Sequence, residues 1–302
     1  MTNPTFSIVI ANYNYGRFLE AAIRSVAAQD MGNQVELIIC DAASTDNSVD
    51  IIKKYADGLP PNTSRLKWVD SDAKPQASSS RLITWWCSEK DGGQSAAFNK
   101  GFSHANGRFL TWLNADDIFT NGALRAIAHE INMHPDCEWF AGSSVWTDSE
   151  LNIQRCFCAH RFSSLRARYG SISVGGPSSF FTKRLLVKVG GFDEGLHYMM
   201  DTDLWYKFYR KCGVKYLRTR HNVFAYRQHE ASKMSGADEH ATERALENRR
   251  RALLESKVLD QRYGRSQGIG SRLALILSAS PCDAFVSFRR ELKWHGLSAT
   301  SI

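Results

Sequence analysis

Two carboxylates follow a short apolar segment in the middle of this chain. Residues 109–113 (FLTWL) form a run of strand length, and Asn114, Asp116 and Asp117 come directly after it. A buried strand that ends this way delivers polar side chains to the carboxyl edge of a parallel sheet, where open α/β folds bind ligands. Neighbouring aspartates there suit a hard divalent cation that also holds phosphate oxygens. The alternative is a solvated acidic turn that leads into a helix over residues 121–134.

Polar side chains also follow two earlier segments of strand length. The apolar run at residues 6–10 (FSIVI) leads into Asn12 and Tyr13, and the run at residues 35–40 (VELIIC) leads into Asp41. A carboxylate at a strand end can accept the imide N–H of a uracil, and such a hydrogen bond discriminates between bases. Asp41 would otherwise cap the turn that follows it. The pattern is compatible with a nucleotide site at the carboxyl ends of the strands.

Strand and helix signals alternate through the first half of the chain. Helical patterns occupy residues 18–26, 44–55 and 93–105, and a further strand signal lies at residues 82–87. Strand, helix, strand at this spacing gives parallel strands joined by right-handed crossovers. Residues 58–80 are rich in Pro, Ser, Asn and Asp and predict a long surface loop. We therefore expect an α/β fold with a mostly parallel central sheet flanked by helices.

The alternation is lost after residue 148. Residues 154–160 and 175–182 have the composition of strands, and residues 202–211 form an amphipathic pattern. Residues 237–263 predict a charged helix. The second half of the chain is therefore expected to extend the sheet and then to end in helical structure.

Composition bounds the class of protein. At 302 residues, with 43% hydrophobic and 23% charged residues, the chain is typical of a globular protein with a substantial core. Seven cysteines without regular spacing argue against a disulfide framework and favour a reduced, cytoplasmic compartment. No segment approaches the ~20 apolar residues of a membrane span. The net charge of +7 is compatible with phosphates, anionic lipid headgroups or nucleic acid as partners.

Four groups of residues occur in an order that matches one enzyme family. They are residues 7–14 (SIVIANYN), 39–46 (ICDAASTD), 91–101 with 114–117, and 190–194 with 201–205. In these segments the chain resembles the family 2 inverting glycosyltransferases of GT-A fold, and specifically bacterial members that build surface polysaccharides. The resemblance implies transfer of a sugar from a nucleotide-diphosphate sugar, a UDP-sugar, to a hydroxyl of a glycan or lipid-linked glycan. Capsule, O-antigen and exopolysaccharide are the products that it implies.

The resemblance assigns residues to the donor. Those that it places at the nucleotide sugar are Ala11, Asn12, Tyr13, Asp41, Asp91, Gln94, Lys100, Asn114 and Asp116. The glycines that follow Asp91 allow close backbone approach to a ligand, and the helix start beside them offers N–H groups to phosphate.

The family also implies a divalent cation, Mn²⁺ or Mg²⁺. Many relatives have aspartate at the position of Asn114, so that in this chain Asp116 and Asp117 would carry the metal between them. His229 resembles a late histidine that some relatives use as a third metal or diphosphate ligand, with a structural role as the alternative. The metal would neutralise the leaving diphosphate.

Asp201 stands at the position of the family's catalytic base, and Met200 replaces the acidic residue that usually precedes it. A carboxylate can take the proton of an attacking hydroxyl. The alternative is that Asp201 caps the helix over residues 202–211. Trp205 would form a wall of the acceptor subsite or belong to the core.

The expected organisation is a GT-A catalytic domain over residues 1–235 followed by a basic helical extension over residues 236–302. Within the domain, residues 1–117 would bind the nucleotide sugar and residues 118–235 the acceptor. The extension mixes cationic and aromatic residues: Arg249, Arg250, Arg251, Phe285, Phe288, Arg289, Arg290, Lys293 and Trp294. This mixture is typical of helices at the membrane interface and predicts peripheral contact with the cytoplasmic face of the inner membrane. A helical tail that packs on the catalytic domain is the alternative.

Two other classes of protein share part of this pattern. A sugar-phosphate nucleotidyltransferase would have a similar sheet and metal site, but its first strand leads into a glycine-rich loop with Arg and Lys, which residues 12–17 (NYNYGR) do not resemble. A nucleic-acid-binding protein would explain the positive charge, but that charge is not arranged as one stripe interleaved with aromatic residues. We expect no binding of nucleic acid.

Overall fold

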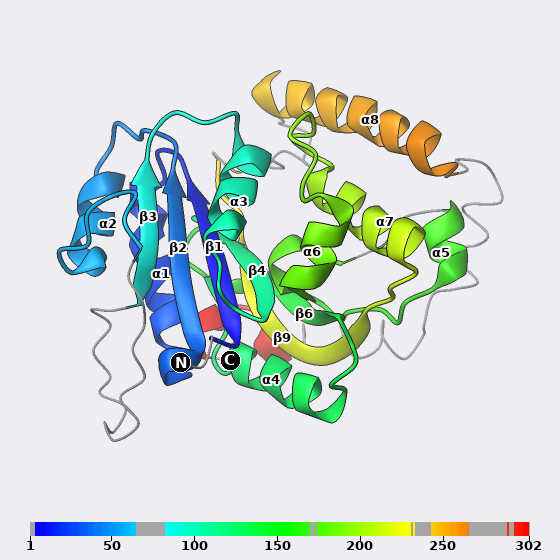
Figure 1. Ribbon diagram of the computed structural model, residues 1–302, viewed down its shortest axis with the longest axis horizontal. Coiled ribbons are helices and arrows are strands. Elements are labelled where there is room, and N and C mark those ends of the chain that lie inside the picture. Colours follow the sequence, from blue (N-terminus) through cyan, green and yellow to red (C-terminus); the bar gives the residue numbers. More distant parts are fainter. Residues whose placement is uncertain are drawn as a thin grey trace.

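A computed structural model describes residues 4–64, 82–169, 172, 174–230, 232, 243–265, 289 and 293–301. Within these residues, four parallel strands form the first half of one continuous sheet, in the order β3-β2-β1-β4 (Figure 1). They are β1 (Phe6–Asn12), β2 (Val35–Asp41), β3 (Ile83–Ser88) and β4 (Phe109–Asn114). Their side chains are buried on both faces, which is why the sequence shows continuous apolar runs there.

The sheet continues beyond β4 with strands of mixed direction. β4 pairs antiparallel with β8 (Ser179–Thr182), β8 with β6 (Trp139–Thr147), and β6 parallel with the long β9 (Leu217–Arg227). Two further strands are β5 (Ile118–Phe119), which pairs with β9, and β7 (Ile153–Phe157), which pairs with β6. Because β5 follows β4 directly and pairs with β9, the end of β9 returns to the carboxyl end of β4.

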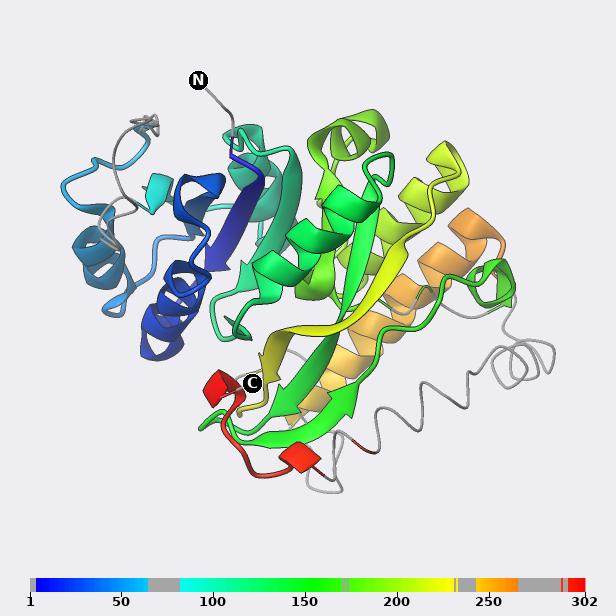
Figure 2. The same cartoon turned by 90° about the horizontal axis from the view of Figure 1, so that it is seen from below.

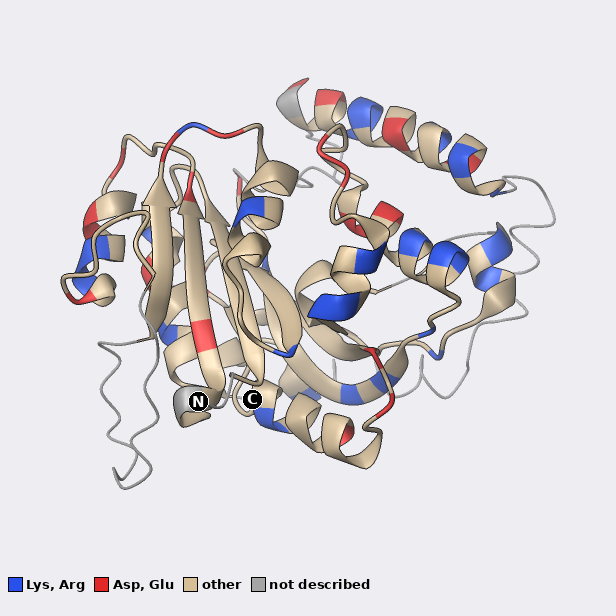
Figure 3. Ribbon diagram, viewed as in Figure 1, with Lys and Arg blue, Asp and Glu red and all other residues tan. Residues whose placement is uncertain are grey.

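Helices cover both faces of the sheet. The helices α1 (Gly16–Ala27), α2 (Ser48–Ala56) and α4 (Ala123–Met133) pack on one face, and α3 (Gln94–Ser103), α6 (Lys183–Val189) and α7 (Met200–Cys212) pack on the other. Alternate residues of β1 serve the two layers: Ile8 and Ile10 join the first, and Val9 joins the second. Charged residues lie mainly on helices and loops, although β9 carries three arginines (Figure 3). The predicted α/β class with helices on a largely parallel sheet is confirmed.

Several expected boundaries differ in the structure. The segment at residues 175–182 begins with a 3-10 turn (Gly176–Ser178) that contains Pro177, and only its last four residues form β8. A short helix, α5 (Ser164–Tyr169), was not predicted. The helix expected from residue 202 begins at Met200, with Met199 at its N-cap. Asp201 therefore lies inside the first turn of α7, and the alternative that it caps this helix is wrong.

The C-terminal residues pack on the rest of the molecule. Helix α8 (Glu243–Tyr263) contacts α7, and its buried residues Ala245, Ala252 and Leu259 recur every seven positions (Figure 1). Residues 296–299 run beside the start of β7, where Leu297 O accepts the N–H of Ile153 at 2.8 Å (Figure 2). No helix of the described residues is both long and apolar enough to cross a bilayer. Residues 65–80 of the expected loop, and Phe285, Phe288 and Arg290, lie outside the described residues.

Candidate active site

The carboxyl ends of β1, β2 and β3 meet around the carboxylate of Asp41. Asn12 Nδ2 donates to Asp41 Oδ1 at 2.7 Å, and Ser88 Oγ donates to Oδ2 at 2.6 Å. Ser44 adds two hydrogen bonds, from its N–H to Oδ2 at 3.0 Å and from its hydroxyl to Oδ1. The parallel register explains this meeting, because Asn12, Asp41 and Ser88 are neighbours across the three strands.

In this arrangement Asp41 does not have a free carboxylate oxygen that could bind a nucleotide base. Its four hydrogen bonds use the acceptor sites of both carboxylate oxygens, and its side chain is only 1% exposed. The role predicted for Asp41, direct contact with the uracil imide, does not fit this geometry. The structure instead shows Asp41 holding the strand ends and the turn at Ser44, which includes the capping alternative.

Residues near Asp41 remain suitable for contact with a nucleotide base. Tyr13 follows β1 and is 58% exposed, so that its ring is open to stacking. Asn12 is buried, and within the described residues its Oδ1 has no hydrogen-bond partner. A buried amide oxygen without a donor is a costly arrangement that a ligand N–H would relieve. Ala11 belongs to β1, which lies between β2 and β4, and it is paired with Asn114 of β4.

The loop and helix that the sequence predicts to bind the donor lie beside the end of β4. Asp91 Oδ1 accepts the N–H of Gly93 at 2.8 Å, which shapes the turn before α3. Gln94, the first residue of α3, donates to Asn114 Oδ1 at 3.0 Å, so these two predicted residues are brought together. Lys100 is instead ion-paired with Glu89, which raises the pKa of Lys100. The ammonium of Lys100 therefore binds Glu89 and takes no part in the contact between Gln94 and β4.

Asp116 and His229 are 113 positions apart in the sequence but in contact in the structure. His229 Nε2 lies 3.0 Å from Asp116 Oδ2, and both side chains are largely buried. The imidazole is held in place by the ring of Phe18, 4.4 Å away between centroids, and by Tyr15 at 5.7 Å. A fixed imidazole beside a carboxylate at the carboxyl end of a strand is a suitable pair of ligands for a divalent cation.

Asp117 points into the protein. Its Oδ1 accepts the N–H of Arg227 at 2.9 Å, its Oδ2 accepts from Asn114 Nδ2 at 2.8 Å, and the side chain is 0% exposed. Burial, and then the nearby charge of Asp116, raise the pKa of Asp117 well above its usual range. The metal role predicted for Asp117 does not fit this orientation. Asp117 instead joins the turn after β4 to the end of β9.

Arg227 was missed in the sequence although it stands two residues before His229. Its side chain is buried, its guanidinium lies 4.8 Å from the centroid of the Phe18 ring, and Asp116 and Asp117 interact with it electrostatically. Burial lowers the pKa of Arg227, and the two carboxylates oppose this shift. A buried cation beside two aspartates is suited to an anionic ligand that approaches Asp116. The sequence signal that could have identified Arg227 is its position at the end of a strand, two residues before His229.

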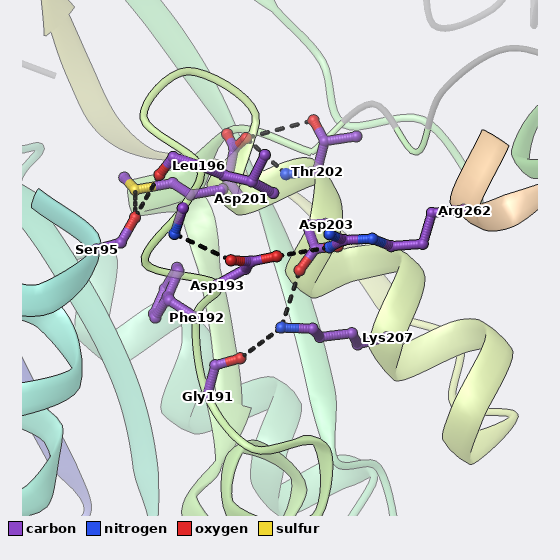
Figure 4. Close-up of polar contacts among 12 residues, drawn as sticks. Ser95, Gly191, Phe192, Asp193, Leu196, Asp201, Thr202, Asp203, Lys207 and Arg262 are labelled. Carbon is purple, nitrogen blue, oxygen red and sulfur yellow. Dashed lines mark hydrogen bonds and ion pairs between the residues drawn. The ribbon is translucent and has the colours of Figure 1, made fainter. Parts of the chain in front are cut away.

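Asp201 lies in the first turn of α7, which packs against the start of α3. Ser95 Oγ donates to Leu196 O at 2.7 Å and lies 3.1 Å from Met200 Sδ, so α7 begins beside the residue that follows Gln94 (Figure 4). Asp201 Oδ1 accepts the N–H of Thr202 at 2.6 Å. This places the predicted base on the same edge as the donor-side residues.

Asp203, two residues further on, is a structural carboxylate. It is wholly buried, and its oxygens are bound by Lys207, Arg262 and Tyr263 at 2.7–2.9 Å. A base must reach the acceptor hydroxyl, so the buried Asp203 is not suited to act as the base in place of Asp201.

Trp205 belongs to the core. Its side chain is 0% exposed and stacks between Trp112 and Trp139, at centroid distances of 5.7 Å and 5.1 Å. The prediction that Trp205 forms a wall of the acceptor subsite is therefore wrong, because no part of its side chain reaches the surface. The alternative that it belongs to the core is the one that the structure shows.

The side chains at the end of β4 suit a metal ion whose coordination also includes oxygens of a bound diphosphate. Within the described ranges, no group of three or more His, Cys, Asp or Glu side chains could hold a metal. Asp116 and His229 could supply two ligand atoms, and the oxygens of a diphosphate would supply others, as Mn²⁺ and Mg²⁺ commonly require.

Solved structures share this fold. S. aureus TarS 1–349 in complex with UDP-GlcNAc superposes with a TM-score of 0.57 at 16% identity, covering 93% of this chain and 77% of that one. The mannosyltransferase PcManGT from Pyrobaculum calidifontis, in complex with GDP-Man and Mn²⁺, gives a TM-score of 0.53 at 14% identity and covers 100% of this chain and 87% of that one. These likenesses confirm the expected GT-A fold.

Sequence relatives define the family. The PGL/p-HBAD biosynthesis glycosyltransferase of Mycobacterium bovis is 30% identical over 204 residues, 67% of this chain and 69% of the relative. A Campylobacter jejuni GalNAc(5)-diNAcBac-PP-undecaprenol beta-1,3-glucosyltransferase and an uncharacterized glycosyltransferase of Rickettsia prowazekii are each 25% identical, over 69% and 70% of this chain. The chain spans only about three fifths of the length of these two, 60% and 61%. The model of Glycosyl transferase family 2 matches residues 7–183, and the chain belongs to this family.

Proposed function

We propose that this chain is a metal-dependent, inverting glycosyltransferase that uses a nucleotide-diphosphate sugar, a UDP-sugar, as its donor. The observation that supports this most is the pair formed by Asp116 and His229 beside the buried Arg227 at the end of β4. Two metal-ligating side chains next to a cation suit a diphosphate better than they suit an uncharged ligand. The family membership supplies the class of reaction.

The residues of this edge divide into three tasks. Asn12 and Tyr13 would bind the base, with Ala11 lining it. Asp116 and His229 would hold Mn²⁺ or Mg²⁺, which when bound supplies Lewis-acid stabilisation of the departing charge. Arg227 adds a fixed positive charge on the same side.

Asp201 is the proposed general base. The acceptor oxygen attacks the anomeric carbon from the face opposite the diphosphate, so that a new C–O bond forms as the bond to phosphate oxygen breaks. The hydroxyl proton passes to the Asp201 carboxylate, and the nucleoside diphosphate leaves with the electron pair. One displacement inverts the anomeric configuration, and no covalent enzyme intermediate forms.

The proposed acceptor is a glycan, or a lipid-linked glycan, in the synthesis of a bacterial surface polysaccharide. The support is the Campylobacter jejuni relative, whose name describes an undecaprenol-linked acceptor. The division into a catalytic domain over residues 1–235 and an extension over residues 236–302 remains part of this proposal, although α8 and residues 296–299 pack on the catalytic part.

Product analysis tests the reaction class. The chain is incubated with UDP-, GDP- and dTDP-sugars, with and without Mn²⁺, and the released nucleotide is identified. We expect release of a nucleoside diphosphate that requires metal and is lost in Asp116→Ala. Release of pyrophosphate from a sugar phosphate and a nucleoside triphosphate would indicate a nucleotidyltransferase instead. Tight, salt-sensitive binding of duplex DNA without turnover would indicate a nucleic-acid-binding protein.

We also propose peripheral contact with the cytoplasmic face of the inner membrane through α8. Its outward face exposes Leu246, Leu253, Leu254 and Val258, and its consecutive arginines 249–251 are also exposed. Apolar and cationic side chains on one surface helix favour an anionic bilayer. Further along the chain, Arg289 and Lys293 are exposed, whereas Trp294 packs against a small core cluster. Flotation with anionic vesicles tests this contact, and an equal yield with neutral vesicles would contradict it.

A further inference from the structure

The loop that leads into α7 is held from two sides. This loop, residues 190–199, is tied to α3 by Asn99, whose Oδ1 accepts the N–H of Phe192 at 2.9 Å and whose Nδ2 donates to Phe192 O at 3.1 Å. Ser95 binds the same loop through Leu196 O (Figure 4). The loop thereby has a direct connection to the helix that starts at Gln94.

The second hold comes from α8 and acts on three consecutive backbone groups. The carboxylate of Glu255 accepts the N–H of His197 at 2.9 Å, of Tyr198 at 2.7 Å and of Met199 at 2.9 Å. Met199 is the N-cap of α7, so Glu255 binds the backbone just before that helix begins. Hydrogen bonds to an ionised acceptor are about twice as strong as neutral ones.

Other residues of α8 hold the flanks of the same segment. Arg262 Nη1 lies 2.7 Å from Asp193 Oδ2, in the loop, and 2.7 Å from Asp203 Oδ1, in α7 (Figure 4). Asn248 Oδ1 accepts the hydroxyl of Tyr198 at 2.7 Å. Asp201 therefore lies between backbone that Glu255 binds and a buried carboxylate that Arg262 binds.

We infer that α8 is a positioning element for the transfer reaction and that Glu255 is its positioning residue. Glu255 fixes the direction in which α7 begins, and through it the direction of the Asp201 carboxylate. Glu255 itself touches neither donor nor acceptor in this account. The inference rests on the proposed function, because it requires Asp201 to act on an acceptor hydroxyl.

The test compares Glu255→Gln and Glu255→Ala with Glu247→Gln. Glu247 is a matched control because it lies on α8 and pairs only with the exposed Arg250 and Arg251 of the same helix in the contacts described. Hydrogen exchange of the peptide that covers residues 193–203 measures the anchoring without any assay of activity. Steady-state kinetics with donor and acceptor varied separately measure the positioning.

We expect faster exchange of residues 193–203 and a kcat lower by about 10–100-fold in Glu255→Ala, because small displacements of a catalytic group have effects of this size. The KM for the donor should stay within about twofold, since the metal and nucleotide contacts are separate from Glu255. Glu255→Gln, which keeps one carbonyl oxygen as acceptor, should be intermediate, and Glu247→Gln should match the wild type.

The exchange and kinetic results separate the ways in which this account can fail. Wild-type exchange in Glu255→Ala would refute the anchoring, whatever the activity. Faster exchange with unchanged kcat would refute the positioning role and leave the proposed function intact. A wild-type chain that transfers no sugar under any condition would overturn the proposed function, and this inference with it.

Discussion

The substitution Asp201→Asn separates a catalytic carboxylate from a structural one. Asparagine has the shape of aspartate and keeps a side-chain oxygen that can accept the N–H of Thr202, so the 2.6 Å contact of the first turn can be retained. What is lost is the negative charge and the ability to bind a proton. The structure thus allows the chemical role to be removed while the local fold is preserved.

The expected effects on turnover and on stability differ widely. Loss of a general base lowers kcat by about 10²–10⁴-fold, which corresponds to about 2.7–5.4 kcal/mol of transition-state stabilisation. Loss of one acidic side chain from the first turn of a helix costs only about 0.3–1 kcal/mol in folding free energy. For a chain of this size, that is a change in Tm of about 0.5–2 °C.

The assay measures kcat with saturating acceptor, the Kd for the nucleotide sugar, and the Tm. Asp50→Asn is a matched control, because Asp50 is an exposed acidic residue in the first turn of α2, a helix whose side chains take no part in the proposed site. We expect Asp50→Asn to reproduce the small change in Tm without the loss of turnover. Wild-type kcat in a folded Asp201→Asn variant would refute the assignment of the base.

Three further predictions concern other parts of the molecule. Asp116→Ala should abolish the Mn²⁺-dependent gain in UDP affinity, measured by calorimetry; a gain of wild-type size would exclude Asp116 as a ligand. Trp205→Ala should lower the free energy of unfolding by about 3–5 kcal/mol, whereas unchanged stability with a raised acceptor KM would restore its predicted role in the acceptor subsite. Lys54, then Tyr55, lower the pKa of Glu20 to about 2, so this carboxylate contributes stability that is present above pH 4.5 and lost as the pH falls towards 2. Urea titrations at pH 7 and pH 3 should show a smaller acid-induced loss in Glu20→Gln than in the wild type; an equal loss would contradict this.

The parallel half of the fold was predictable because its signals are local. β1 and β2 are buried on both faces and therefore appear as continuous apolar runs, each followed at once by polar residues. The mixed half gave weaker signals. β9 has an irregular pattern of buried and exposed positions over its 11 residues, and its partner β5 has only two residues. The pairings of β9 with β5 and β6 join segments that are far apart in the sequence, and no local sequence pattern predicts such pairings.

Adjacent residues in a turn show why the site was only partly predictable. Asp116 and Asp117 are chemically identical, and what distinguishes them lies far along the chain: the N–H of Arg227, 110 positions later, binds Asp117, and His229 contacts Asp116. Trp205 has the composition of either a sugar-binding wall or a core residue, and two distant tryptophans decide between them. Asp41 was correctly placed at a strand end, but the number of protein donors around it could not be counted from sequence.

The pairing of residues 296–299 with the start of β7 has a consequence for synthesis of the chain. Among the described strands, β7 pairs only with β6, and its other side is covered where Leu297 O meets the N–H of Ile153. These two residues are 144 positions apart (297 − 153), which a ribosome takes about 7–30 s to translate. During that interval one edge of the sheet has no partner from this segment, and unpaired edges attract other strands. The edge at β7 should therefore be exposed to misassociation until residues 296–299 emerge.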